Sequence, residues 1–176
     1  MRKVRSTLLA CGLALLGVAC NDDSSKASER ALDTRLETHA VLPGTASAEG
    51  LAYVQAIVEA HRDADSLDDR QARVARLLAA LEQQPPPADG TAQVLHYELL
   101  ARTAELMLEA GEAERALALL EPRLGTSVSL PLDRASARCL VDLGDAAAQT
   151  GDHALAMGSY ARALELLSLM LEEVQQ

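Results

Sequence analysis

Apolar residues recur at helical spacing along the chain beyond about residue 50. Within residues 67–82, Val74, Leu77, Leu78 and Leu81 stand at i, i+3, i+4 and i+7, which places them on one face of an α-helix. The same spacing, interrupted by glycine and proline, predicts six helices, over residues 51–61, 67–82, 91–110, 112–121, 131–150 and 153–174.

Local residues also predict where these helices begin. Ser66 with Asp69 three residues later resembles a capping box for the second helix, and Thr91 is placed to cap the third. Pro131 suits the first turn of the fifth helix, because proline there loses no intrahelical hydrogen bond. Asp152 is expected to cap the last helix.

Prolines and glycines predict where the helices end. The run Pro85-Pro86-Pro87 prevents the second helix from continuing, because proline lacks an N–H and restricts the residue before it. Pro122 and Gly125 are expected to end the fourth helix. Gly111 and Gly151 follow the third and fifth helices at the position where a left-handed residue closes a helix.

Composition supports an all-α fold. Hydrophobic residues make up 49% of the chain but aromatic residues only 2%, with no Trp or Phe. A core of Leu, Ala and Val suits closely packed helices, whereas sheets draw on β-branched and aromatic residues. The segment Gly111–Ala116 recurs as Gly151–Ala156, 40 residues later, with Gly and Ala at matching positions. The predicted architecture is three stacked antiparallel helix pairs in a short solenoid.

The last pair resembles a tetratricopeptide repeat. The residues that carry the resemblance are Leu143, Gly144, Gly151, Asp152, Ala156, Tyr160, Ala163 and Leu164. The resemblance implies that Gly144, Ala156 and Ala163 permit close helix approach. It also implies that Tyr160 fills the gap between its pair and the neighbouring pair.

The match weakens toward the N-terminus. The middle pair keeps Ala104, Gly111 and Ala116 but has Leu120 in place of the aromatic residue, and the first pair is only loosely similar. The spacing of 40 residues also exceeds the family's repeat of about 34 residues. A generic helical bundle is the alternative fold.

The first residues have the layout of an export signal. A basic start is followed by the uncharged apolar stretch Ser6–Val18, which is too short for a comfortable membrane span. The ending Leu16-Gly17-Val18-Ala19-Cys20 resembles a bacterial lipobox, although Gly17 stands where that family usually has Leu. The resemblance implies cleavage before Cys20 and attachment of acyl chains such as palmitate. An ordinary signal peptide or an uncleaved anchor is the alternative.

These features divide the chain into three parts. Residues 1–19 are predicted to be a lipoprotein signal peptide, residues 20–49 a lipidated N-terminus and flexible tether, and residues 50–176 the helical repeat domain. Cleavage would remove Cys11, and acylation would occupy the sulfur of Cys20, so Cys139 would have no partner for an intramolecular disulfide. We expect Cys139 to be a small buried residue. The expected location is the periplasmic side of a Gram-negative envelope, with the outer membrane favoured over the inner.

Charge and motifs argue against several functions. The net charge of −10 becomes −13 when a leader carrying Arg2, Lys3 and Arg5 is removed, which disfavours nucleic acid binding. The acidic segment 63–69 lacks the glycine and closing glutamate of a calcium loop. No motif of a zinc, nucleophile or phosphate site occurs. We therefore expect no catalytic residue, metal ligand or cofactor.

The last predicted helix carries a wide apolar arc. This candidate partner surface consists of Leu164, Leu166, Leu167, Leu169, Met170 and Leu171. Repeat arrays normally end in a helix with a polar outer face, so this surface predicts binding to another envelope protein, as an adaptor in assembly, secretion or pilus biogenesis. Three alternatives remain: self-association of a structural lipoprotein, a small-ligand binder or enzyme, and a helix that folds back onto an earlier pair.

Overall fold

The computed structural model describes residues 38–39, 47–83, 90–126 and 128–174. The predicted leader, Cys20 and Pro85-Pro86-Pro87 lie outside these residues. The described part is all-α, as predicted, apart from a pair of two-residue strands. Its elements are β1 (Thr38–His39), α2 (Ala48–Asp65), α3 (Arg70–Gln83), α4 (Gly90–Glu109), α5 (Ala113–Leu124), β2 (Leu130–Pro131), α6 (Arg134–Thr150) and α7 (His153–Val174).

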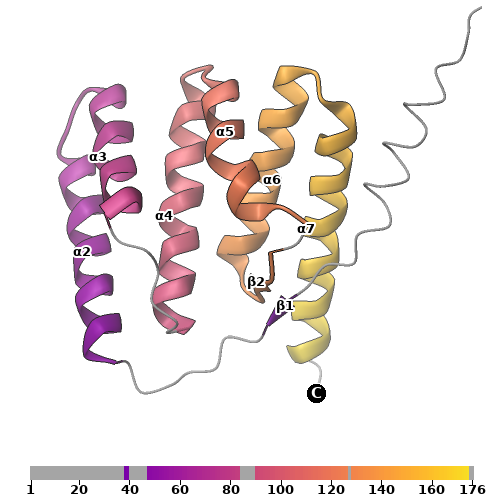
Figure 1. The fold of residues 1–176 in the computed structure, drawn as a ribbon, viewed down its shortest axis with the longest axis horizontal. Coiled ribbons are helices and arrows are strands. Elements are labelled where there is room, and N and C mark those ends of the chain that lie inside the picture. Colours follow the sequence, from indigo (N-terminus) through magenta and orange to yellow (C-terminus); the bar gives the residue numbers. More distant parts are fainter. Residues whose placement is uncertain (1–37, 40–46, 84–89, 127, 175–176) are drawn as a thin grey trace, which may run out of the picture.

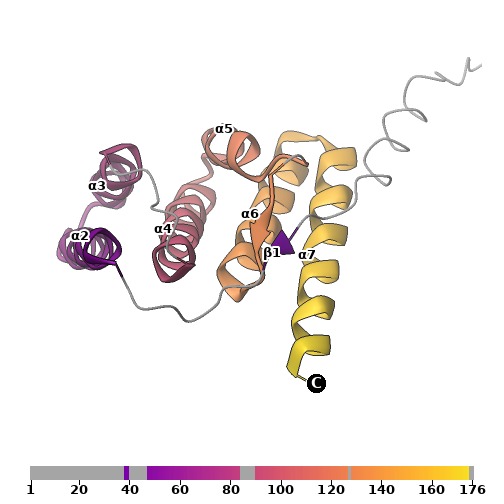
Figure 2. The same ribbon diagram turned by 60° about the horizontal axis from the view of Figure 1, so that its bottom comes forward.

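The helices stand side by side in chain order, from α2 and α3 at one end to α7 at the other (Figure 1). Each helix packs on the next along the chain, α4 also packs on both α2 and α6, and α3 and α5 contact the first helix of the following pair. The second view separates α3 and α5 from the row that α2, α4 and α6 form (Figure 2). Long-range contacts therefore connect neighbouring pairs.

Short polar side chains begin several helices. The N–H of Gly50 donates to Ser47 Oγ over 2.9 Å at the start of α2. At the start of α6, Asp133 Oδ1 accepts from the N–H groups of Ala135 and Ser136 over 2.7 and 3.0 Å. Asp152 caps α7 by accepting from the N–H of Leu155 over 3.0 Å, as predicted. These bonds satisfy N–H groups that have no partner within the helix.

Two glycines close helices in the predicted way. Gly111 has a φ of 75° and Gly151 a φ of 86°, a left-handed conformation that costs glycine little. The residue after each glycine donates a hydrogen bond back to the preceding helix. The N–H of Glu112 donates to the Met107 carbonyl, and the N–H of Asp152 donates to the Ala147 carbonyl. The turns within the second and third pairs therefore share one geometry.

Three predicted starts differ from the structure. Asp69, rather than Ser66, caps α3, accepting from the N–H of Ala72 over 2.7 Å, while Ser66 closes α2. α4 already begins at Gly90, so Thr91 lies inside its first turn. Pro131 belongs to β2 and lies before α6, whose N-cap is Asp133.

Of the two residues expected to end α5, Gly125 is the C-cap, but Pro122 does not stop the helix. α5 continues to Leu124 with Pro122 inside it. Near the end of a helix a proline removes a single intrahelical hydrogen bond. The adjacent Arg123 side chain donates to the Leu119 carbonyl over 2.8 Å, which adds a hydrogen bond within this last turn.

The core runs through all three pairs and consists mainly of Leu and Ala. Fully buried examples are Ile57, Leu77, Leu99, Leu100, Leu120, Leu140, Leu143 and Leu166. Cys139 is also fully buried, with its Sγ donating to the Tyr97 carbonyl over 3.2 Å. Burial raises the pKa of the Cys139 thiol well above its usual value, which keeps it protonated and unreactive.

One buried hydrogen bond joins the first and second pairs. The Tyr53 hydroxyl on α2 and Nδ1 of His96 on α4 lie 2.7 Å apart. Burial, with a smaller contribution from the positive charge of Arg123, lowers the pKa of His96 to about 4. His96 is therefore neutral at neutral pH and needs this partner.

We expect Tyr53→Phe to lower the free energy of unfolding by about 1–2 kcal/mol, because it leaves a buried imidazole nitrogen without its partner. Urea unfolding followed by circular dichroism measures the change. Replacing both partners, with Tyr53→Phe and His96→Leu, should recover part of the loss. An unchanged unfolding midpoint for Tyr53→Phe alone would show that the bond contributes nothing.

Candidate protein-interaction surface

The residues that resemble a tetratricopeptide repeat sit at helix contacts and turns. Leu143, Ala116, Ala156 and Ala163 are at most 4% exposed. Gly111 and Gly151 instead form the helix-closing turns described above. Apart from the exposed Leu164, the resemblance therefore falls on residues at helix contacts, turns and a helix cap.

Tyr160 contacts α6 within its own pair, through Gly144 and Asp145. Its ring lies over Gly144, so that a Cβ atom at residue 144 would stand 2.7 Å from Cδ1 and 2.8 Å from Cζ of the ring. The Tyr160 hydroxyl donates to Asp145 Oδ1 over 2.6 Å. This hydrogen bond is the largest cause that raises the pKa of Tyr160 to about 12.

A groove of about 550 Å³ runs between α4, α6 and α7. It is lined by Glu98, Arg134, Ala137, Arg138, Val141 and Leu167. Arg138 bridges to α4 through Glu105 at 2.6 Å and Glu98 at 3.8 Å. The groove thus combines fixed charges with the exposed apolar side chains of Val141 and Leu167.

The predicted partner surface on α7 divides into two parts. Leu166 is fully buried and belongs to the core, and Leu169 and Met170 are partly buried. Leu164, Leu167 and Leu171 are exposed, with fractions of 66%, 40% and 64%. The accessible apolar surface is therefore narrower than the predicted arc.

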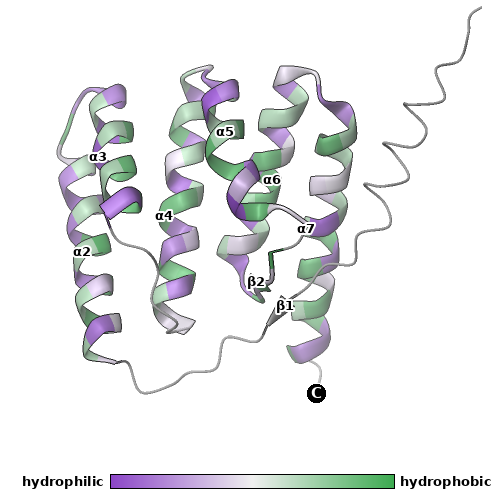
Figure 3. Ribbon diagram, viewed as in Figure 1, coloured by the Kyte–Doolittle hydropathy of each residue, from purple (hydrophilic) through white to green (hydrophobic). Residues whose placement is uncertain are grey.

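Two exposed residues extend this surface beyond the predicted segment. Met157 is 70% exposed and Val174 85% exposed. They stand seven residues before Leu164 and three residues after Leu171, on the same side of the helix. We call Met157, Leu164, Leu167, Leu171 and Val174 the α7 stripe. Apolar positions recur along the whole of α7 (Figure 3).

The α7 stripe is open because α7 lies at the end of the array. Among the described elements, α7 makes extensive contacts with α6 alone. Its buried side, which includes Ala163 and Leu166, packs there. The adjacent side of the helix is largely exposed within the described chain.

Three polar groups are buried near this end of the array. Arg162 donates to the Leu124 carbonyl over 2.6 Å. Among the described residues, Asp142 Oδ2 and Ser159 Oγ have no hydrogen-bond partner. Burial is the largest cause that raises the pKa of Asp142 to about 7; Arg138 lowers it, and Glu105 and Asp145 raise it further.

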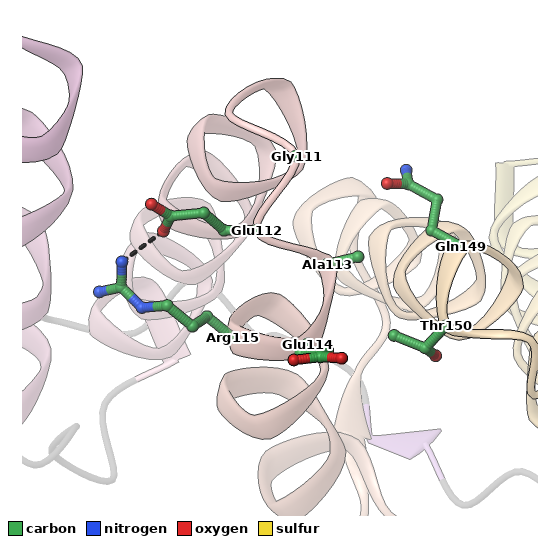
Figure 4. Close-up of a pocket in the computed structure, with 7 residues that line it drawn as sticks. All are labelled: Gly111, Glu112, Ala113, Glu114, Arg115, Gln149 and Thr150. Carbon is green, nitrogen blue, oxygen red and sulfur yellow. Dashed lines mark hydrogen bonds and ion pairs between the residues drawn. The ribbon is translucent and has the colours of Figure 1, made fainter.

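A second hollow, of about 610 Å³, lies where the turn between α4 and α5 meets the end of α6 (Figure 4). Glu112 and Arg115 form an ion pair with each other in it, and Thr150 donates to the Ala146 and Ala147 carbonyls. These side chains stabilise local structure. The hollow therefore offers less to a ligand than the groove between α4, α6 and α7.

The acidic segment near residue 65 also has structural partners. Asp63 forms an ion pair with Arg76 at 2.9 Å, and Asp69 caps α3. Within the described ranges, no group of three or more His, Cys, Asp and Glu side chains could hold a metal ion.

No protein-family model, curated protein or solved structure matches this chain. The function must therefore be inferred from the sequence and surface of this chain itself. Within the described residues, α7 is the one helix long and apolar enough to cross a membrane. Because α7 packs Ala163 and Leu166 into the core, it is an integral part of the helical array.

Proposed function

We propose that this chain is a bacterial lipoprotein, anchored through lipid on Cys20, whose helical domain binds another protein of the cell envelope. The groove between α4, α6 and α7 is the observation that carries the binding role. Its exposed Val141 side chain gives apolar contact, and the charges of Arg134, Arg138 and Glu98 can orient a partner.

The packing pattern supports a tetratricopeptide-like array. Each helix contacts the next, and among the first helices of the pairs α4 contacts both α2 and α6. The turns at Gly111 and Gly151 are alike, and Gly144 admits an aromatic ring from the helix that follows it. Arrays of this kind bind segments of other proteins along an extended surface.

The lipid anchor is supported by the leader and by the chemistry of the three cysteines. Cys20 follows the apolar stretch and small residues of the leader. Cys11 lies within the leader itself, and Cys139 is buried and protonated. Lipid on Cys20 would place the domain on the periplasmic face of a membrane, for which we favour the outer membrane.

Replacing Cys20 by Ser is expected to abolish incorporation of palmitate into the protein, because the acylated sulfur is lost. Metabolic labelling with a palmitate analogue in the expressing bacterium measures this incorporation. Cys11→Ser and Cys139→Ser are matched controls that should keep the label. Label that persists in Cys20→Ser would contradict the proposed anchor.

The binding role is tested by crosslinking in cells, followed by capture of the full-length protein. A groove variant, Arg134→Glu with Val141→Glu, is compared with a control at the other end of the array, Arg62→Glu with Leu51→Glu. All four positions are exposed, and both variants change the charge equally. One dominant envelope protein should be lost from the groove variant alone. Equal recovery by both variants would overturn the proposal.

A further inference from the structure

The α7 stripe has the spacing of a coiled-coil seam. Its five residues and Tyr160 alternate at intervals of three and four residues, in the order Met157, Tyr160, Leu164, Leu167, Leu171 and Val174. These are successive a and d positions over three heptads, the pattern that packs against another helix with the same spacing. We propose that the α7 stripe binds the α7 stripe of a second copy of this chain.

The residues beside the seam allow two acidic copies to approach. The e positions hold Ala161 and Ser168, and the g positions hold Ala163 and Met170. None of them carries a charge, although the chain has a net charge of −10. Glu165 and Glu172 lie at b positions, away from the seam. A seam with neutral flanks avoids the like-charge repulsion that would oppose self-association.

The charges at the two ends of α7 favour an antiparallel pair. Glu172 and Glu173 lie in the last turn, which has no basic residue, whereas His153 begins the helix. A parallel pair would bring the acidic ends together at the negative ends of both helix dipoles. An antiparallel pair places each acidic end beside the positive end of the partner helix.

The seam is self-complementary in the antiparallel arrangement. A twofold axis between Glu165 and Leu166 sets Leu164 opposite Leu167, Tyr160 opposite Leu171 and Met157 opposite Val174. Every a position thus meets a d position of the other copy, and each of these contacts occurs twice, once in each direction, as a twofold interface requires. Pairing in this way also covers the open end of both helical arrays.

The first test measures the mass of the full chain in mild detergent by sedimentation, with Cys11→Ser and Cys20→Ser included to remove the other thiols. We expect a dimer whose dissociation constant rises at least about 100-fold in Leu164→Glu with Leu171→Glu. The matched control is Leu51→Glu with Val58→Glu, two exposed apolar residues of α2, and it should remain dimeric. Equal masses for the two double variants would overturn the proposal.

The second test determines the orientation by disulfide crosslinking in the same background. Copies with Met157→Cys should crosslink to copies with Val174→Cys and not to one another. Cys139 is buried and is not expected to react. Crosslinks between two Met157→Cys copies would overturn the antiparallel arrangement.

The third test asks whether the α7 stripe binds lipid instead. The same chain is mixed with vesicles of phosphatidylethanolamine and phosphatidylglycerol and floated on a density gradient. The Leu164→Glu with Leu171→Glu variant should float as well as the control variant does, because in the unchanged chain a second copy covers the stripe and the stripe adds nothing to vesicle binding. A monomeric chain that loses vesicle binding in this variant alone would overturn the proposal in favour of a lipid surface.

Discussion

Replacing Asp142 by Asn is expected to raise the free energy of unfolding by about 2–4 kcal/mol at pH 8. The Asp142 side chain is buried on α6, and its Oδ2 atom has no hydrogen-bond partner in the part of the chain that the structure describes. Its raised pKa of about 7 means that the fold favours the neutral carboxyl group. An ionised carboxylate at this position opposes folding, and Asn removes that ionisation with little change in shape.

The sign of the pH dependence follows from the raised pKa of Asp142. Its unfolded pKa is near 3.8 and its folded pKa about 7, so the wild type loses stability as the pH rises through this range. The advantage of Asp142→Asn should therefore be small near pH 4, grow toward pH 7 and stay constant above it. Urea unfolding of both proteins at several pH values measures this difference.

A surface carboxylate provides the matched control for Asp142. Glu114 on α5 is exposed, and Glu114→Gln should change the free energy of unfolding by less than about 0.5 kcal/mol at every pH. An Asp142→Asn protein that is equally stabilised at pH 4 and pH 8 would show that ionisation of Asp142 does not oppose folding.

Gly144→Ala is expected to lower the free energy of unfolding by about 2 kcal/mol. The added methyl group would lie within 3 Å of several atoms of the Tyr160 ring, so the ring must move away as a whole. The hydrogen bond from the Tyr160 hydroxyl to Asp145 is then lost. The gain in helix propensity from Gly to Ala, about 1 kcal/mol, offsets only part of this loss. Thermal and urea unfolding measure the change.

The middle pair supplies a control for Gly144→Ala. Ala104 and Leu120 stand 40 residues before Gly144 and Tyr160, and both are fully buried. The last pair thus combines Gly144 with the large ring of Tyr160, whereas the middle pair combines the larger Ala104 with the smaller side chain of Leu120. Gly144→Ala combined with Tyr160→Leu should recover at least half of the loss. A double variant as unstable as Gly144→Ala would contradict the steric explanation.

Helix positions could be predicted from the sequence because their signals are local. The apolar spacing predicts all six helices of the described residues, and Gly111, Gly151 and Asp152 act where predicted. The errors at Ser66, Pro122 and Pro131 are shifts of a few residues, where a neighbouring capping residue or carbonyl contact determines the helix end.

The exposed surface could be predicted only in part, because exposure depends on where neighbouring helices lie. Periodicity places Leu164 and Leu166 on one wide apolar arc, but the position of α6 buries Leu166 and leaves Leu164 exposed. The spacing of Met157, Leu164 and Leu171 at intervals of seven residues was a signal that could have extended the predicted surface. The burial of Asp142 and the ring of Tyr160 over Gly144 depend on packing that no local pattern specifies.

The short parallel pairing of β1 with β2 determines where tension from a membrane anchor would enter the fold. Thr38 and His39 pair with Leu130 and Pro131, in the segment before α6. With lipid on Cys20, the 18 residues from there to Thr38 can span at most about 60 Å. The domain would then be held from the middle of its chain, beside α6, and not from the start of α2. A force along the tether would act first on this two-residue pairing. Separation of the two strands would lengthen the segment between Cys20 and the helices while the helices remain folded.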